Sequence, residues 1–351
     1  MSDLCIHIGA RAIGPGHPCY IIAEMSANHG QSLDQALRIV HAAKEAGADA
    51  IKLQTYTADT LTLDCDHPCF RIGAGTLWEG RNLHQLYQEA FTPWDWQPRL
   101  KAEAEKLGMD CFSTPFDATA VDFLEGMGVL CHKIASFEIV DLPLIRRVAA
   151  TGKPVIMSTG MATLAEIEEA VTTARAAGCR ELALLKCNSG YPAPATEMNL
   201  RTIPHLSEAF GVPAGLSDHT LDLAVPVAAV TLGACILEKH FTLDRSVPGP
   251  DNAFSLEPAE FAATVKAVRT AEAALGRVHY APSAREAPSR AFRKSLFVCA
   301  DIAEGQPFTE ENVRCIRPGD GLHSRHLDQV LASRARRALK RGTPLTLADL
   351  A

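Results

Sequence analysis

The chain has 351 residues, 47% of them hydrophobic and 21% charged, which is enough for one large core and a smaller second domain. Its net charge of −7, from 34 basic and 41 acidic residues, gives no electrostatic footprint for nucleic acid or an anionic membrane surface. No stretch approaches the ~20 apolar residues of a membrane span, and the N-terminal segment does not resemble a secretion signal. The eleven cysteines contain no Cys-x-x-Cys pair and fit reduced thiols. We therefore predict a cytoplasmic protein without nucleic-acid or membrane partners.

Short apolar runs alternate with longer amphipathic segments from residue 19 to about residue 276, which is typical of repeated βα units around a parallel sheet. Helix-like segments at 33–46, 164–177 and 258–275 are each followed by a glycine. The predicted strands are residues 20–26, 50–55, 111–116, 131–136, 155–159, 183–189, 214–217 and 235–240. Eight such units predict an α/β fold, a (β/α)8 TIM barrel, whose typical size is ~250 residues.

An open doubly wound sheet is the alternative architecture, but no G-x-G-x-x-G follows the first predicted strand. After residue 276 the composition changes to a segment rich in Pro, Ala, Ser and Arg, which indicates a linker. Short apolar stretches at 295–299, 313–316 and 340–347 then fit a compact module. We predict a barrel domain at 1–280, a linker at 281–294 and a small domain at 295–351.

Polar residues gather where the predicted strands end, which in a TIM barrel is the edge that carries the active site. Lysine supplies a positive charge and hydroxyl groups supply neutral donors, a combination that holds a small phosphorylated anion without a glycine-rich loop. One such residue would be interpreted as a solvated rim residue, whereas several on consecutive strands favour a site. The candidates are Lys52, Thr114, Lys133, Ser136, Ser158, Ser189 and Ser217.

Two histidines, His219 and His240, lie at the ends of the last two predicted strands. Their rings are therefore expected to lie on adjacent strands of the barrel, within reach of one divalent cation. Two imidazoles leave positions for water and a substrate oxygen. The alternative is a pair of hydrogen-bonding histidines, and the acidic neighbours Asp218 and Glu238 favour the metal site.

The carboxylate Glu24 ends the first predicted strand and is expected to point into the site, where it could move a proton or activate water. It could also pair with Lys52 or Lys133, and both roles can hold together if the pairing is loose.

Several segments resemble the sialic acid synthases over almost the whole chain. They are residues 22–29 (IAEMSANH), 51–55 (IKLQT), 113–116 (STPF), 132–136 (HKIAS), 215–220 (GLSDHT) and 238–241 (EKHF). Within that family, residues 24–29, residues 77–81 (LWEGR) and Tyr87 are more similar to pseudaminic acid synthases than to N-acetylneuraminate synthases. Residues 187–192 also depart from the N-acetylneuraminate pattern, which makes the role of Ser189 less secure than those of Lys52 and Lys133.

The resemblance implies condensation of phosphoenolpyruvate with an amino-sugar, 2,4-diacetamido-2,4,6-trideoxy-β-L-altropyranose, to give pseudaminic acid and phosphate. N-acetylneuraminate or legionaminic acid synthesis is the alternative. The resemblance further implies a divalent metal cofactor, most readily Mn²⁺, with Mg²⁺ or Co²⁺ as substitutes. It also implies that the small C-terminal domain is an antifreeze-like (SAF) domain and that the protein forms a domain-swapped homodimer. Sugar contacts are implied for Tyr191, Asp251, Glu138 and Arg317, the last reaching into the neighbouring barrel.

Two rival hypotheses stay open. Lys133 or Lys52 could form a Schiff base, as in barrel aldolases that need no metal. Alternatively, the chain could be a non-catalytic sugar-binding or ice-binding protein built on its terminal module, in which case His219→Ala would leave function intact.

Overall fold

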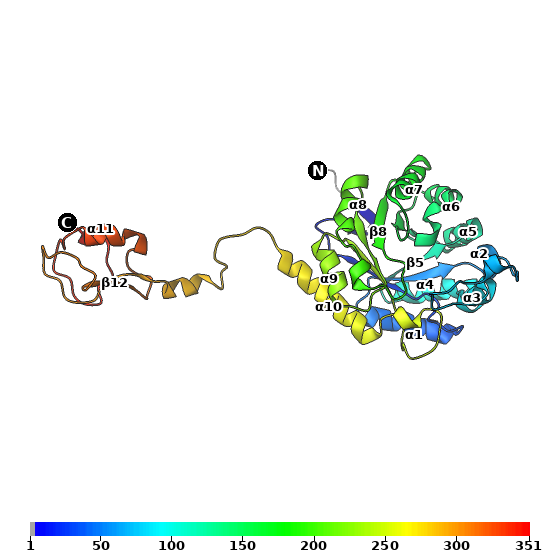
Figure 1. The fold of residues 1–351 in the computed structure, drawn as a ribbon, viewed down its shortest axis with the longest axis horizontal. Coiled ribbons are helices and arrows are strands. Elements are labelled where there is room, and N and C mark those ends of the chain that lie inside the picture. Colours follow the sequence, from blue (N-terminus) through cyan, green and yellow to red (C-terminus); the bar gives the residue numbers. More distant parts are fainter. Residues whose placement is uncertain (1–3) are drawn as a thin grey trace. The chain divides into compact units, whose positions relative to one another are not determined.

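The computed structural model describes residues 4–351 and divides the chain into two compact units. The first unit ends at Gly276, and the second comprises Arg277–Ala351 (Figure 1). Within residues 4–351, every helix is too short or too polar to cross a membrane. All eleven cysteines are free thiols.

The first unit is a closed barrel of eight parallel strands, which confirms the predicted TIM barrel. The last strand pairs with both the preceding strand and the first one, so the alternative of an open sheet is wrong. In chain order the strands are β3 (Tyr20–Glu24), β4 (Ala50–Thr55), β5 (Asp110–Pro115), β6 (His132–Ile134), β7 (Val155–Ser158), β8 (Leu182–Cys187), β9 (Ala214–Asp218) and β10 (Ile236–His240).

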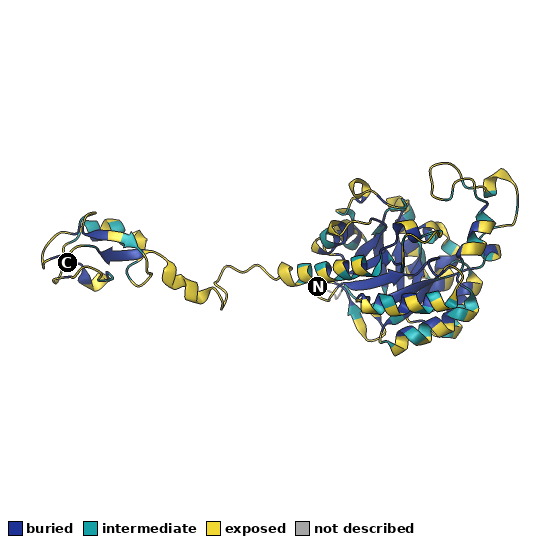
Figure 2. Cartoon of the chain, turned by 90° about the horizontal axis from the view of Figure 1, so that it is seen from below, coloured by how far each residue is buried: buried dark blue, intermediate teal, exposed yellow. Residues whose placement is uncertain are grey.

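Helices surround the barrel and turn their apolar faces to the strands (Figure 2). The three predicted helices are confirmed to within one residue at each end, and capping explains their starts: Ser32 caps α1 and Thr163 forms a capping box with Glu166 at α7. The helices are α1 (Leu33–Glu45), α2 (Ala58–Leu61), α3 (Leu83–Ala90), α4 (Gln97–Lys106), α5 (Ala118–Met127), α6 (Leu142–Ala149), α7 (Leu164–Ala176), α8 (Thr202–Phe210), α9 (Ala224–Thr231) and α10 (Pro258–Leu275).

Side chains alternate along each strand between the barrel interior and the helix layer, because successive residues of a strand point to opposite faces. Ile21 of β3, Leu216 of β9 and Ile39 of α1, for example, belong to one outer cluster. Tyr20 and Ile22 belong instead to a separate inner cluster. The inner cluster fills the half of the barrel near the strand starts with apolar side chains.

An N-terminal hairpin that the sequence pattern did not predict closes the same end of the barrel. Its strands are β1 (Ile6–Ile8) and β2 (Arg11–Ile13), and the isoleucines of both join the inner cluster. With this end plugged by apolar side chains, the open end lies at the C-terminal ends of the strands, where TIM-barrel active sites occur.

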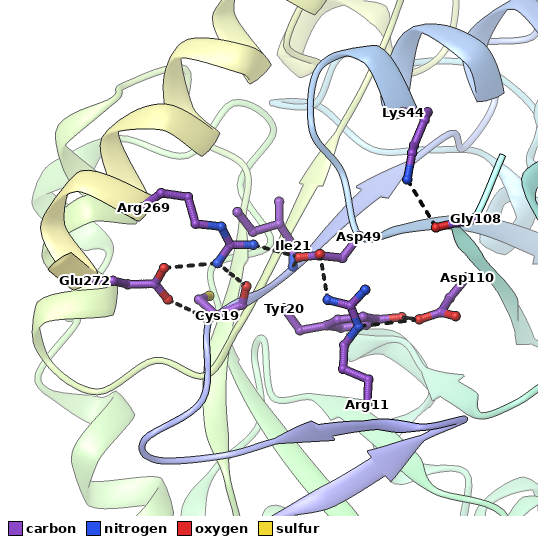
Figure 3. Close-up of polar contacts among 10 residues, drawn as sticks. All are labelled: Arg11, Cys19, Tyr20, Ile21, Lys44, Asp49, Gly108, Asp110, Arg269 and Glu272. Carbon is purple, nitrogen blue, oxygen red and sulfur yellow. Dashed lines mark hydrogen bonds and ion pairs between the residues drawn. The ribbon is translucent and has the colours of Figure 1, made fainter.

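A polar network around Asp49 ties the hairpin, the strand starts and α10 together (Figure 3). Asp49 accepts hydrogen bonds from Arg11 at 2.8 Å, from the Ile21 backbone at 2.9 Å and from Arg269 at 2.8 Å. Arg269 also donates to the Cys19 carbonyl at 2.7 Å. The network stabilises the closed end of the barrel and lies away from the C-terminal ends of the strands.

The second unit has its own small core around a two-stranded antiparallel sheet of β11 (Ser295–Val298) and β12 (Val313–Ile316), with the short helix α11 (Leu327–Leu331). Buried members of this core include Leu296, Phe308 and Leu345. Residues 277–294, which precede the sheet, are exposed and contain one 3-10 helix, Ala287–Phe292.

Candidate active site

A ring of polar side chains forms the last inward-facing layer of the barrel, directly above the apolar layers. Glu24 follows the inward-facing Ile22 by two residues, and Lys52 and Thr114 stand in the same relation to Ala50 and Phe112. The same spacing turns Ser158, Ser217, Glu238 and His240 inward. Burying so many polar groups is costly unless they pair with each other or with a ligand.

Lys52 lies at the centre of one half of the ring. Its ammonium nitrogen is 2.6 Å from Glu24 Oε2, 3.5 Å from Glu238 Oε1 and 3.2 Å from the hydroxyl of Thr114. All four side chains are buried. The expected pairing of Glu24 with a lysine is therefore present.

Lys133 occupies the other half of the ring. It donates to Ser158 Oγ at 2.6 Å and to the carbonyl of Ile134 at 2.8 Å. Burial lowers its pKa, with the neighbouring charge of Lys52 adding to the effect and Glu238 opposing it. Because its hydrogen-bond partners are neutral, the Lys133 ammonium group could still form an ion pair with a bound anion.

The two carboxylates of the ring have opposite pKa shifts. Burial raises the pKa of Glu24, and the charge of Glu238 adds to this while Lys52 opposes it. Burial would also raise the pKa of Glu238, but the charges of Lys133 and Lys52 outweigh it and lower the pKa. Glu238 is influenced by two lysines, whereas within residues 4–351 Lys52 is the one lysine within ion-pair distance of Glu24. Glu24 is therefore the better proton acceptor of the pair.

The hydroxyls of Ser136 and Ser189 both lie beside Gly160, in the space that a side chain at this position would occupy. A Cβ atom at Gly160 would lie 2.7 Å from Ser136 Oγ and 2.4 Å from Ser189 Oγ, so glycine is needed for both to fit. Ser136 also accepts from the Gly160 backbone at 3.0 Å. Neither serine is in a strand, because β6 ends at Ile134 and β8 at Cys187, earlier than predicted. The start of the 3-10 helix Ser136–Val140 and the loop after β8 thus bring them to the ring.

The remaining predicted anion-site hydroxyl, Ser217, lies 3.4 Å from Glu238 Oε1. The structure thereby places all seven of these side chains at the C-terminal ends of the strands of one barrel. Sequence reasoning treated Glu238 as a neighbour of His240 and missed it as a member of the ring. The missed signal was its two-residue spacing from His240, which puts both on the inner face.

The rings of His219 and His240 have centroids 5.2 Å apart. His219 donates from Nδ1 to the Asn188 carbonyl at 2.7 Å, which leaves its Nε2 available as a ligand. Among residues 4–351, His240 Nδ1 is buried and has no hydrogen-bond partner. Burial, with the charges of His219, Lys52 and Lys239 adding to it, lowers the pKa of His240 well below its ordinary value, which favours the neutral imidazole that a metal ligand requires. Burial would also lower the pKa of His219, but the neighbouring Cys187 outweighs it and raises that pKa.

These features fit a divalent cation held by two imidazoles. Within residues 4–351, His, Cys, Asp and Glu side chains form no group of three or more suited to a metal ion, so water or substrate would complete the coordination. The expectation that acidic neighbours support both histidines is wrong for Asp218. Its carboxylate faces away from the ring and pairs with Lys239 at 2.6 Å.

Aromatic side chains flank the histidine pair on one side. The Tyr191 ring lies 4.4 Å from His219 and 4.8 Å from Phe254, and Phe254 lies 4.9 Å from His240. Phe254 belongs to a 3-10 helix, Asn252–Phe254, in the loop after β10, and nothing in the sequence pattern indicated it.

Asp251 directly precedes this 3-10 helix and accepts hydrogen bonds from the Ser26 hydroxyl and, at 3.4 Å, from the Ala27 backbone. Ser26 has a φ of 46°, a strained conformation for a serine and one that clusters at functional sites. Asp251 is thereby fixed beside the end of β3. The structure thus brings Asp251 and Tyr191 to the same end of the barrel as the histidines.

Glu138 lies in the 3-10 helix Ser136–Val140, two residues after Ser136. Its Oε2 is buried without a hydrogen-bond partner in the described part of the chain, and burial raises its pKa to about 7. An unpaired buried carboxyl is free to receive a ligand hydroxyl or amide. Arg317, by contrast, belongs to the second unit, where it directly follows β12.

The signature residues Asn28 and His29 hold the loop after β3 and do not join the ring. Asn28 donates to the Phe241 carbonyl at 2.9 Å and to Ser255 Oγ at 2.8 Å. The His29 ring accepts from the Gln31 backbone at 3.1 Å, and burial lowers its pKa to about 4. Both residues thus fix the loop that carries Ser26.

A separate cavity of about 800 Å³ lies on the outer face of the barrel, lined among others by Lys186, Arg201 and His205. Lys186 points outward from β8 and donates to the Cys187 carbonyl at 2.8 Å. Volume alone does not define a site, and this cavity holds none of the ring residues.

A TIM barrel whose open end carries buried lysines, a basic carboxylate and a histidine pair belongs to the class of barrel enzymes that bind anionic substrates at the strand ends. The chain is a member of the NeuB family, whose pattern matches residues 39–280, and residues 293–351 match the SAF domain.

Known proteins agree with this placement. The chain is 43% identical to the pseudaminic acid synthase of Helicobacter pylori over 95% of its own length and 98% of the relative, and 44% identical to that of Campylobacter jejuni over 94% and 96%. Its fold matches the crystal structure of N-acetylneuraminic acid synthetase from Leptospira borgpetersenii, bound to citrate, with a TM-score of 0.73. That match has 33% identity and covers 82% of this chain and 95% of the other.

Proposed function

We propose that the chain condenses phosphoenolpyruvate with 2,4-diacetamido-2,4,6-trideoxy-β-L-altropyranose to give pseudaminic acid and phosphate. The observation that carries the proposal is the convergence of two buried lysines, Lys52 and Lys133, with the histidine pair at one barrel end. Identity above 40% to pseudaminic acid synthases over nearly the full chain supports the choice of sugar.

The two lysines and their hydroxyl partners would bind phosphoenolpyruvate. Lys52 and Lys133 supply positive charge in a buried setting, where electrostatic attraction is stronger than in water. Ser136 and Ser189 beside Gly160, with Thr114, Ser158 and Ser217, supply directional donors to the phosphate and carboxylate oxygens. Holding the enolpyruvate carbons against the sugar aldehyde reduces the entropic cost of reaction.

In the reaction, C3 of phosphoenolpyruvate forms a bond to the aldehyde carbon of the open-chain sugar. Water then adds to C2, and the bond from C2 to the phosphate oxygen breaks to release phosphate. Glu24 would take the proton from that water, since its pKa is raised and it lies beside Lys52. Tyr191, Asp251 and Glu138 would orient the sugar. Arg317 would contact the substrate from a partner subunit.

His219 and His240 would hold a divalent metal ion, and a bound ion would polarise the sugar aldehyde as a Lewis acid. Imidazole and water ligands suit Mn²⁺ first, with Co²⁺ or Mg²⁺ as substitutes. We further propose a domain-swapped homodimer in the cytoplasm. The exposed segment 277–294, which precedes the small core of the second unit, supports a swapped arrangement.

The test is phosphate release from phosphoenolpyruvate with a sugar panel of N-acetylmannosamine and the 2,4-diacetamido-2,4,6-trideoxy hexoses. We expect turnover of the altro sugar, and turnover of N-acetylmannosamine alone would overturn the assignment. With oxygen-18 in the bridging position of phosphoenolpyruvate, the label should leave with phosphate. Retention of the label in the sugar would contradict C–O cleavage.

A further inference from the structure

A hairpin in the loop after β4 contacts two other loops at the strand ends. Its two arms pair through the bridge between Arg71 and Asn82, and Ile72 exchanges backbone hydrogen bonds of 2.9 Å with Arg81 and Gly80. We call residues 71–82 the β4 hairpin. Residues 73–80 at its tip are exposed except for Trp78, which is half-buried.

Trp78 makes the contacts between this hairpin and the other loops. Its indole nitrogen donates to the Pro250 carbonyl at 2.9 Å, in the loop after β10. Its ring lies 5.7 Å from that of Tyr191, in the loop after β8. Trp78 therefore joins loops from three separate strands, and an exposed hairpin tip needs such a contact to be held in place.

The contacts of Trp78 are Tyr191, which packs on His219, and the residue before Asp251. Pro250 directly precedes Asp251, and the Tyr191 ring is 4.4 Å from His219. Tyr191 also lies 4.8 Å from Phe254, so Trp78, Tyr191 and Phe254 form a continuous aromatic row. An aromatic row favours methyl and deoxy carbons over hydroxylated ones, because it offers a hydroxyl few hydrogen-bond partners.

We propose that Trp78 is a positioning and specificity-determining residue that fixes Tyr191 and Asp251 and selects amino-sugars with an apolar C6. The selection of sugar rests on the proposed function, whereas the fixing of the two loops does not. The alternative is that the tryptophan merely anchors the hairpin for stability. A purely structural anchor would not be expected to change KM for the sugar while leaving KM for phosphoenolpyruvate unchanged.

The kinetic test compares Trp78→Ala and Trp78→Phe with Leu77→Ala, a neighbour on the same hairpin whose side chain is exposed. Trp78→Ala should raise KM for the sugar about tenfold or more and leave KM for phosphoenolpyruvate within about twofold. Trp78→Phe keeps a ring but lacks the N–H group, so its KM for the sugar should lie between those of the wild type and Trp78→Ala. Leu77→Ala should have the KM of the wild type. An equal rise in both KM values would overturn the proposal.

Specificity is tested with a 6-hydroxy analogue of the sugar. In Trp78→Ala, the kcat/KM preference for the 6-deoxy sugar over this analogue should fall about fivefold or more, and an unchanged preference would refute selection at C6. If the wild type turns over another sugar of the panel, the proposed function fails, but the KM comparison runs with that sugar and still decides the positioning role.

A readout without substrate is hydrogen exchange of peptides covering residues 188–193 and 246–256. Exchange should rise in Trp78→Ala but not in Leu77→Ala. Unchanged exchange in both peptides would overturn the positioning role even if the enzyme acts on none of the sugars.

Discussion

The ammonium group of Lys239 lies 2.6 Å from the carboxylate of Asp218, and both side chains are buried on the outer side of the barrel wall. Each is a sequence neighbour of a histidine that faces the opposite way. Lys239 also donates to the Thr220 carbonyl at 2.7 Å. The pair thus links the end of β9 to the end of β10 on the side of the wall away from the ring.

This arrangement predicts different outcomes for lysines on the two faces of the wall. Lys133→Met removes an inward-facing charge and should lower kcat/KM by about 100-fold or more, since a buried charged contact to the phosphorylated substrate is lost. Lys186 is an outward-facing lysine of β8, so Lys186→Met should keep kcat/KM within about threefold of the wild type. Phosphate release measures both, and equal loss in the two variants would contradict the assignment of Lys133.

Metal removal should abolish activity. EDTA treatment is expected to stop phosphate release, and added Mn²⁺ should restore it. His219→Ala and His240→Ala should each lose activity and bound metal, as measured by elemental analysis, whereas His205→Ala, at an exposed position, should lose neither. Full activity in EDTA, with borohydride trapping of a keto substrate on Lys133 or Lys52, would favour the Schiff-base mechanism. Intact function of His219→Ala would favour a non-catalytic protein.

Stability should depend on the ionisation of Glu138. Its pKa is raised by burial to about 7, above the ordinary 4.5, so the folded state binds this proton more tightly than the unfolded state. The associated stability is present below about pH 4.5 and is lost as pH rises through about 7. Glu138→Gln should remove this loss. Relative to the wild type, its free energy of unfolding should therefore rise by on the order of 1–3 kcal/mol when the pH is changed from 5 to 8. Urea unfolding at both pH values checks this, and a difference independent of pH would contradict it.

The polar network at the closed end should affect stability and not catalysis. Asp49→Ala leaves Arg269 without its 2.8 Å partner and the Ile21 N–H group without an acceptor, and should cost about 1–3 kcal/mol of unfolding free energy. Arg11→Ala removes a more exposed partner and should cost less than about 1 kcal/mol. KM values should be unchanged in both, and a loss of substrate affinity in Asp49→Ala would show coupling between the two barrel ends.

The swapped dimer can be tested by complementation. Arg317→Ala and Lys133→Met chains should each be inactive alone. Coexpressed, they should recover about a quarter of wild-type activity, because half of the dimers would be mixed and each mixed dimer would hold one intact site. Absence of recovery in purified mixed dimers would show that Arg317 acts within its own chain or not at all.

The sequence by itself determined the barrel, because eight apolar runs that alternate with amphipathic segments are buried by a closed parallel sheet with helices around it, and it determined which strand ends are polar. Lys52, Lys133, His219 and His240 were found because strand ends in a barrel converge. Only the tertiary structure decided that Glu238 lies beside Lys52 and that Asp218 pairs with Lys239, and that Trp78 reaches Pro250 and Tyr191. The closing N-terminal hairpin and the row from Trp78 to Phe254 depend on contacts between segments distant in the chain, which local pattern does not encode.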